Sequence, residues 1–114
     1  MEKMSGKPGI LKIPPAVYRD SGAANFHTYH QYVIRVDQRD KLREYLLSKG
    51  VPTAVYYPLP LHLQECFSNR GYKKGDFPRA EKSAGEVLAL PIYPELTESQ
   101  QEYIVSAIES FFSL

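Results

Sequence analysis

The chain has 114 residues, which is the size of a single domain and leaves no room for a second. Its hydrophobic content of 43% and charged content of 24% are ordinary for a soluble globular protein. A net charge of +1, without clustered Lys and Arg, argues against partners such as nucleic acid or an anionic membrane. We find no secretory signal pattern and no apolar run close to the ~20 residues of a membrane helix.

The start of the chain differs in composition from the rest. Residues 1–26 are rich in Gly, Pro, Ser and charged side chains, which is typical of irregular structure. We therefore expect a mostly irregular lead-in over residues 1–26 and the folded domain over residues 27–114. Such a lead-in fits a chain that continues upstream, or the cut edge of a longer one.

Two strands are expected in the first half of the folded part. Residues 30–36 are aromatic and β-branched, and their alternation places Tyr32, Ile34 and Val36 on one face. Residues 53–57 predict a second, shorter strand.

Helices are expected after each of these strands. Asp37 is the expected cap of the first helix, which ends at Gly50. Residues 61–69 are expected to be helical, and Asp76 is the expected cap of the helix that follows. A narrow apolar stripe on that later helix consists of Ala80, Ala84, Val87 and Leu88.

The last third predicts a strand over residues 89–93, at a sheet edge or bulge because prolines flank it, and then a helix. Thr97 and Gln100 form a capping box for this helix. Its apolar stripe is Tyr103, Ile104, Ala107, Ile108, Phe111 and Phe112. The resulting order, βαβ(αα)βα, predicts an α/β fold (an α+β sandwich) with a small three-stranded sheet and helices packed on one face.

Residues 56–64 (Tyr-Tyr-Pro-Leu-Pro-Leu-His-Leu-Gln) are the most informative stretch for function. Two prolines restrict this loop, which carries Tyr56, Tyr57, His62 and Gln64. A stiff loop with hydroxyls and an imidazole is typical of a ligand-contact surface. The alternative is a turn whose aromatic side chains cover an edge of the core.

Other candidate sites favour structural roles. His27 and His30 point to opposite faces if both lie on a strand, so no metal site is expected. Cys66 with His62 has the spacing of a helical pair, but we expect a buried, unreactive thiol. The single cysteine cannot form an internal disulfide, which favours a cytoplasmic location. Arg35 is either an anion contact or, as we favour, an outward-pointing surface residue.

The carboxylates form no acid–base pattern in the sequence. Glu81, Glu86 and Glu98 are expected on solvated helix faces. No glycine-rich phosphate loop is present, because the glycines lack the required strand–loop–helix context.

Five motifs resemble the sugar aminotransferases of the DegT/DnrJ/EryC1/StrS family from about residue 13 to the C-terminus. They are residues 29–36 with Arg39 and Asp40, residues 53–64, Gly71 and Tyr72 with residues 75–78, Ala80 and Glu81, and residues 88–96. The resemblance covers only the family's small C-terminal domain. It implies the largely antiparallel sheet found in the small domain of fold-type-I pyridoxal-phosphate (PLP) enzymes.

The resemblance also implies a function. Family members move an amino group, usually from glutamate, to a ketone on a nucleotide-linked sugar, in antibiotic or surface-polysaccharide pathways. The cofactor lysine and phosphate contacts lie in the large domain, so we expect no cofactor bound by this chain alone and no transaminase activity. We also expect self-association through an exposed docking face.

The resemblance assigns substrate contact to the loop at residues 56–64, with Tyr57 and His62 first, then Gln64 and Tyr56. The family commonly has His where this chain has Tyr56, and tyrosine does not titrate near neutral pH. Two alternatives stay open. One is a non-catalytic ligand- or protein-binding βαβ module derived from this fold. The other, an RNA-binding sheet, lacks a complete motif.

Overall fold

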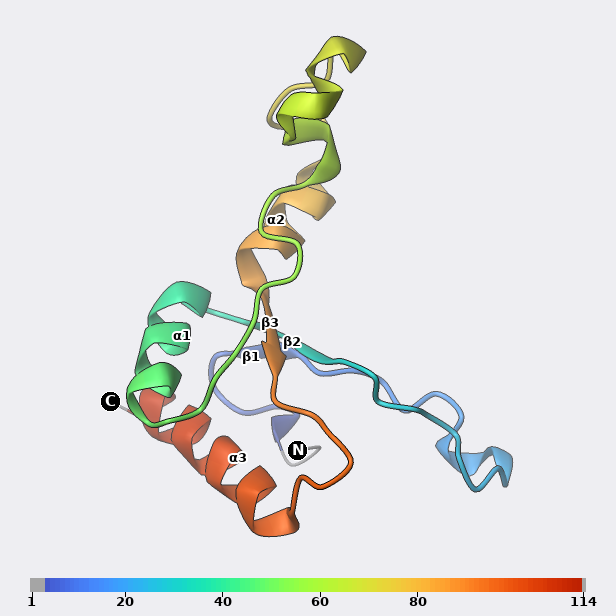
Figure 1. Cartoon of the computed structure of the whole chain (residues 1–114), viewed down its shortest axis with the longest axis vertical. Coiled ribbons are helices and arrows are strands. Elements are labelled where there is room, and N and C mark those ends of the chain that lie inside the picture. The colour runs from blue at the N-terminus through green and yellow to red at the C-terminus, as the bar shows by residue number, and fades with distance from the viewer. Residues whose placement is uncertain (1–3, 114) are drawn as a thin grey trace.

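The computed structural model describes residues 4–113 and contains a three-stranded antiparallel sheet in the order β1-β2-β3 (Figure 1). The strands are β1 (Ile10–Lys12), β2 (Tyr32–Val36) and β3 (Val87–Leu90). The α-helices are α1 (Arg39–Ser48), α2 (Pro78–Glu86) and α3 (Glu98–Phe112). Short 3₁₀ helices are η2 (Arg19–Ser21), η3 (Leu61–Leu63) and η4 (Glu65–Arg70). The predicted fold class is confirmed.

β2 is the central strand and carries one face of the core. Its residues alternate in burial as the sequence predicted, with Tyr32, Ile34 and Val36 buried. Tyr32 pairs with Leu90 and Ile34 pairs with Leu88 in the antiparallel register with β3. The α1 and α3 helices pack against each other and, with these strands, close one apolar cluster. Its buried members include Leu42, Leu46, Ile104, Val105, Ala107 and Ile108.

The sheet is built from different strands than the sequence predicted. Residues 53–57 do not form a strand, and only Ala54 bridges to Ala89. The third strand is instead β1, inside the segment that was expected to be mostly irregular. The chain reaches this position through Gly9 (φ +72°), where a Cβ atom would lie 2.0 Å from the Phe112 ring. This pairing depends on contacts between distant segments, so local composition did not reveal it.

The third predicted strand, residues 89–93, lies two to three residues too late. β3 begins at Val87, so Val87 and Leu88 belong to the strand rather than to the helix stripe. The edge position predicted from the prolines is confirmed, because β3 is the last strand of the sheet. Ala80, assigned to the same stripe, is exposed, and Ala84 is buried.

Two of the predicted helix caps are wrong. The residue before α1 is Gln38 in a left-handed conformation, not Asp37. The residue before α2 is Phe77, with Pro78 opening the helix, and the Asp76 carboxylate instead accepts a hydrogen bond from the Lys73 amide. In both cases the carboxylate is one residue too early to reach the free amides of the first turn.

The C-terminal helix agrees closely with the sequence. The capping box of Thr97 and Gln100 is confirmed. Ile104, Ala107 and Ile108 are buried as predicted. Tyr103 is not part of the buried stripe, because its ring is exposed and its hydroxyl donates a hydrogen bond to the Lys49 carbonyl at 2.9 Å.

Two arms extend from the body formed by the sheet, α1 and α3 (Figure 1). The upper arm (residues 57–86) contains η3, η4 and α2, and the side arm (residues 13–30) contains η2. The radius of gyration is 16.2 Å, against about 13 Å for a compact domain of this length. Over the described residues, none of the helices has the length and apolar character to cross a membrane.

Candidate functional site

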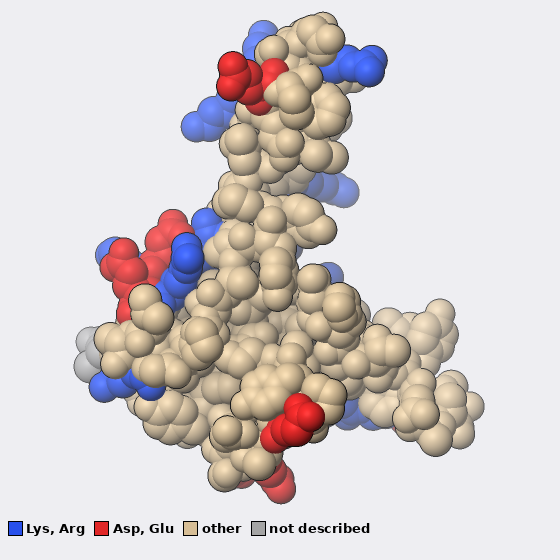
Figure 2. All heavy atoms as spheres, viewed as in Figure 1, with Lys and Arg blue, Asp and Glu red and all other residues tan. Residues whose placement is uncertain are grey.

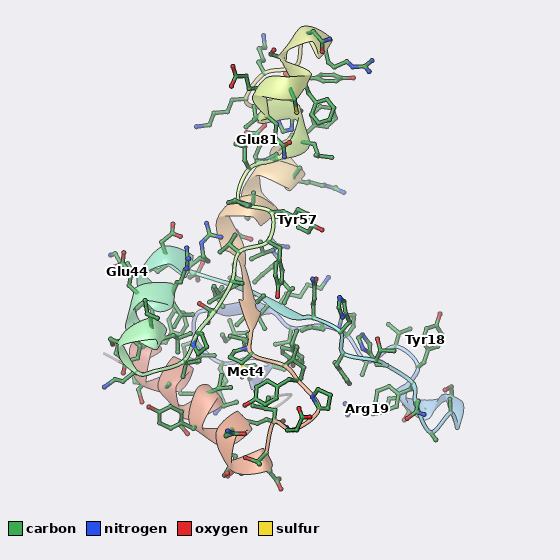
Figure 3. The ribbon with its side chains drawn as sticks, in the orientation of Figure 1. Met4, Tyr18, Arg19, Glu44, Tyr57 and Glu81 are labelled. Carbon is green, nitrogen blue, oxygen red and sulfur yellow. The ribbon has the colours of Figure 1, made fainter. Side chains whose placement is uncertain are left out.

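The loop at residues 56–64, called the strap from here on, begins at the base of the upper arm. Two prolines, Pro58 and Pro60, restrict its backbone, and Pro60 has extended backbone angles just before η3. Tyr57 is 76% exposed, and in Figure 3 it projects toward the side on which the side arm lies. Tyr56 is about half exposed. Within residues 4–113 neither hydroxyl forms a hydrogen bond, so both are available to a ligand.

His62 lies in a different environment from the tyrosines. Its side chain is only 7% exposed, and its Nε2 atom lies 2.9 Å from Glu81 Oε1. The ring packs on Phe77 with a centroid separation of 4.8 Å. The side chain of His62, which the resemblance assigns to substrate contact, is therefore mostly covered and already paired with Glu81. The ring packs against Phe77 at the start of α2 and is not part of the apolar core cluster.

Glu81 does not lie on the solvated helix face that its position in the sequence predicts. Its side chain is 17% exposed, and its Oε1 atom also accepts a 2.7 Å hydrogen bond from the Gly75 amide. That hydrogen bond, together with the one from His62, lowers the pKa of the Glu81 carboxyl. Its partners lie 6 and 19 residues away in the chain, so helical periodicity alone carried no signal for this role.

The side chains of Gln64 and Cys66 make their contacts within the strap and the start of η4. The Gln64 side-chain amide approaches the Leu59 carbonyl at 3.5 Å, and its Oε1 atom lies 3.8 Å from Cys66 Sγ. Residues 61–69 are not one α-helix, because extended backbone at Gln64 separates η3 from η4. Cys66 is therefore not stacked on His62, and it is exposed rather than buried as expected.

Arginines fasten the upper arm to the body. Arg35 on β2 forms an ion pair with Glu86, with Nε 2.9 Å from Oε2. Arg39, whose side chain is only 9% exposed, donates from Nη1 to the carbonyls of Ala84 at 3.1 Å and Val87 at 3.0 Å. Arg35 thus lies on the face of β2 away from the core, as favoured, although it is paired there, and the expectation of a solvated Glu86 is wrong. The last turn of α2 is therefore bound by one guanidinium group from β2 and one from the start of α1.

Histidines of the side arm do not lie in a strand. The His27 Nδ1 atom accepts a hydrogen bond from the Tyr29 amide at 2.8 Å, and the two rings stack at 4.1 Å. His30 lies two residues before β2. Across residues 4–113, no three metal-ligating side chains are grouped together.

The face between the arms is poor in charge. Figure 2 shows uncharged side chains over most of it, with charged groups at the tip and side of the upper arm, beside α1 and on the lower part of the body. Exposed aromatic and aliphatic side chains are concentrated in the upper arm and the strap. Those in these two segments are Tyr56, Tyr57, Leu59, Leu61, Phe67, Tyr72 and Phe77, and six more lie elsewhere on the described residues. This surface is suited to contact with another protein surface or a bulky ligand.

The three-stranded antiparallel sheet with its packed helices defines a small α/β domain. The sequence model of the DegT/DnrJ/EryC1/StrS aminotransferase family matches residues 3–109. The chain belongs to the DegT/DnrJ/EryC1/StrS aminotransferase family.

Two curated relatives and one solved structure illustrate the similarity. A "pleiotropic regulatory protein" of Geobacillus stearothermophilus is 53% identical over 76% of this chain and 23% of its own length. The dTDP-3-amino-3,4,6-trideoxy-alpha-D-glucose transaminase of Streptomyces venezuelae is 35% identical over 73% of this chain and 22% of its own length. The crystal structure of S. venezuelae DesV in complex with a ketimine intermediate superposes with a TM-score of 0.82 at 30% identity, covering 99% of this chain and 29% of DesV. The chain thus spans about a quarter of the length of these proteins.

Proposed function

We propose that this chain acts as the C-terminal small domain of a PLP-dependent nucleotide-sugar aminotransferase, which transfers an amino group from glutamate to a keto-sugar nucleotide. The observation that carries the proposal is the family match over residues 3–109, together with the similarity to a sugar-nucleotide transaminase. The superposition on DesV over nearly the whole chain supports the same role. Antibiotic or surface-polysaccharide sugars are the expected products, and a cytoplasmic location is proposed with them.

In this proposal the strap contributes to substrate binding. Tyr57 and Tyr56 present free hydroxyls that can donate hydrogen bonds to sugar hydroxyls, and the aromatic rings can cover a sugar face. His62 and Gln64, which we first assigned to direct contact, act by holding the loop, since each is engaged within the upper arm.

The described residues do not fit PLP. A Schiff-base lysine needs an amine in a desolvated pocket that lowers its pKa. Every lysine within residues 4–113 is exposed: Lys7, Lys12, Lys41, Lys49, Lys73, Lys74 and Lys82. We therefore assign the cofactor to a large domain that is not part of this sequence.

The proposal is tested by joining this chain to a large domain from a matching family member. Purified enzyme with PLP is assayed for transfer from glutamate to a panel of keto-sugar nucleotides. We expect turnover with the joined protein and none with either part alone. A joined protein that holds PLP and processes no keto-sugar nucleotide in the panel would contradict the proposal.

Borohydride trapping tests the absence of a cofactor lysine. The chain is mixed with PLP, reduced, and mapped by mass spectrometry. Because all described lysines are solvated, we expect scattered partial labelling across several of them. A stoichiometric adduct on a single lysine would show that the chain has its own aldimine site.

The isolated chain is expected to self-associate at high concentration. The exposed apolar side chains of the upper arm and strap leave a surface that favours association in the absence of a partner domain. Sedimentation velocity across a concentration series, with an apolar dye as a second readout, measures this. A strictly monomeric and dye-silent protein would instead favour a surface adapted to stand alone.

One observation favours a second candidate function. The relative with 53% identity is named a pleiotropic regulatory protein, which fits a non-catalytic binding module. Under that alternative, the isolated chain would bind a ligand or protein partner with full affinity. Titrating keto-sugar nucleotides into the chain alone distinguishes the aminotransferase domain from the binding module. The aminotransferase hypothesis requires the large domain for tight binding.

A further inference from the structure

The structure points to Glu81 as the residue that holds the strap in place. Its Oε1 atom is shared by His62 Nε2 at 2.9 Å and by the Gly75 amide at 2.7 Å. We call Glu81, His62 and Gly75 the Glu81 cluster. It joins η3, at the end of the strap, to the turn before α2 and to α2 itself, which lie more than ten residues further along the chain.

The surroundings of the Glu81 cluster make its hydrogen bonds costly to lose. The His62 side chain is almost fully buried, so removing its partner would leave a buried polar ring unpaired. Gly75 has φ +97°, a conformation that other residues adopt only with strain, and this orients its amide toward the carboxylate. Phe77 packs on His62, and Tyr72 packs on Phe77 at 5.1 Å, which shields the cluster from one side.

The cluster is connected to the sheet through α2. Five residues after Glu81, Glu86 pairs with Arg35 of β2, and the last turn of α2 is bound by Arg39. A continuous set of contacts therefore runs from the sheet through α2 and Glu81 to His62 in the strap. Figure 3 shows Glu81 above Tyr57 in the upper arm. Tyr57 lies five residues before His62. Pro58 and Pro60 restrict the backbone between them, so the position of His62 limits where Tyr57 can lie.

We propose that Glu81 is a positioning residue for substrate: through His62 and Gly75 it fixes the strap on α2 and thereby sets where Tyr57 lies. The inference rests on the proposed function of Tyr57. Glu81 touches no substrate in this arrangement. Its loss is expected to raise KM for the keto-sugar nucleotide while leaving kcat largely unchanged.

The first readout is amide hydrogen exchange on the chain itself. In Glu81→Ala, we expect faster exchange at the Gly75 amide and across residues 57–76, with β2, β3 and α3 protected as before. Glu81→Gln keeps an oxygen that accepts both hydrogen bonds, so it should restore part of the protection. Arg79→Gln, an exposed change on the same helix, is the matched control and should behave as the parent.

The second readout is steady-state kinetics of the enzyme that contains this chain. We expect Glu81→Ala to raise KM about ten-fold, because a displaced contact group loses most of its effect. Glu81→Gln should lie between Glu81→Ala and the parent. Unchanged exchange and unchanged KM in Glu81→Ala would overturn the proposal. So would loss of protection throughout the body in both Glu81 variants, because Glu81 would then support the whole fold.

The same enzyme separates failure of this inference from failure of the proposed function. If Tyr57→Ala leaves KM unchanged while Glu81→Ala loosens the arm, Tyr57 does not contact substrate, and positioning by Glu81 fails with it. If Tyr57→Ala raises KM while Glu81→Ala changes neither exchange nor KM, the substrate contact holds and only the role of Glu81 is refuted.

Discussion

Replacing Ile108 by alanine is expected to lower the free energy of unfolding by about 2–5 kcal/mol. Ile108 is 1% exposed and lies in the apolar cluster that α1 and α3 close against the sheet. Truncation removes buried methyl groups and leaves a cavity that a close-packed core fills only in part. For a domain with a total stability of about 5–15 kcal/mol, this is a large share. Thermal and urea unfolding of the two proteins measure the difference.

The control is the neighbouring Glu109→Ala. Glu109 lies on the outer face of α3 and forms an ion pair with Lys7, with Nζ 3.0 Å from Oε1. Exposed pairs of this kind contribute about 0–1 kcal/mol, so the melting temperature should fall only slightly. Equal melting temperatures for Ile108→Ala and Glu109→Ala would refute the orientation of α3 described above.

Replacing Tyr57 by alanine is expected to lower kcat/KM of the joined enzyme by about 10- to 100-fold. The change removes both the exposed hydroxyl and the ring that we assign to the sugar. Because the side chain is 76% exposed, the melting temperature should not change. Steady-state kinetics with the keto-sugar nucleotide as the varied substrate give the result.

Tyr57→Phe separates the hydroxyl from the ring. Losing one neutral hydrogen bond should lower kcat/KM by about 2- to 10-fold, less than the alanine variant. If both variants turn over as the parent does, the strap is a structural loop and the assignment of Tyr57 to the substrate is wrong. A fall confined to kcat, with KM unchanged, would also argue against a ground-state sugar contact.

The strap shows how far local sequence can predict a site. The prolines and tyrosines of residues 56–64 predicted a stiff loop suited to ligand contact, and Tyr57 is 76% exposed in it. His62 was placed in the same group because it lies in the same stretch. Its burial follows from contacts with Glu81 and Phe77, which lie 19 and 15 residues further along the chain. Whether a polar side chain is free or paired depends on such distant partners.

Arg35 and Arg39 also pair with partners that local sequence does not predict. Arg35 stands in an apolar strand, and a strand pattern predicts only that it lies on the face away from the core. Glu86, its partner, lies 51 residues further along the chain. Arg39 reaches carbonyls 45 and 48 residues away. No periodicity in the sequence encodes these pairs, so the attachment of the upper arm to the sheet was not predicted.

By itself, the sequence determined the features that depend on neighbouring residues: the central strand β2 with its alternating burial, the helix α3 with its capping box and buried stripe, and the motifs of the family. The tertiary structure alone decided the features that join distant segments. These are the recruitment of β1 into the sheet, the reduction of residues 53–57 to one bridge, and the burial of His62 on Glu81. The physical reason is that strand pairing and buried polar contacts depend on which distant segments pack against each other. A local sequence pattern does not contain that information.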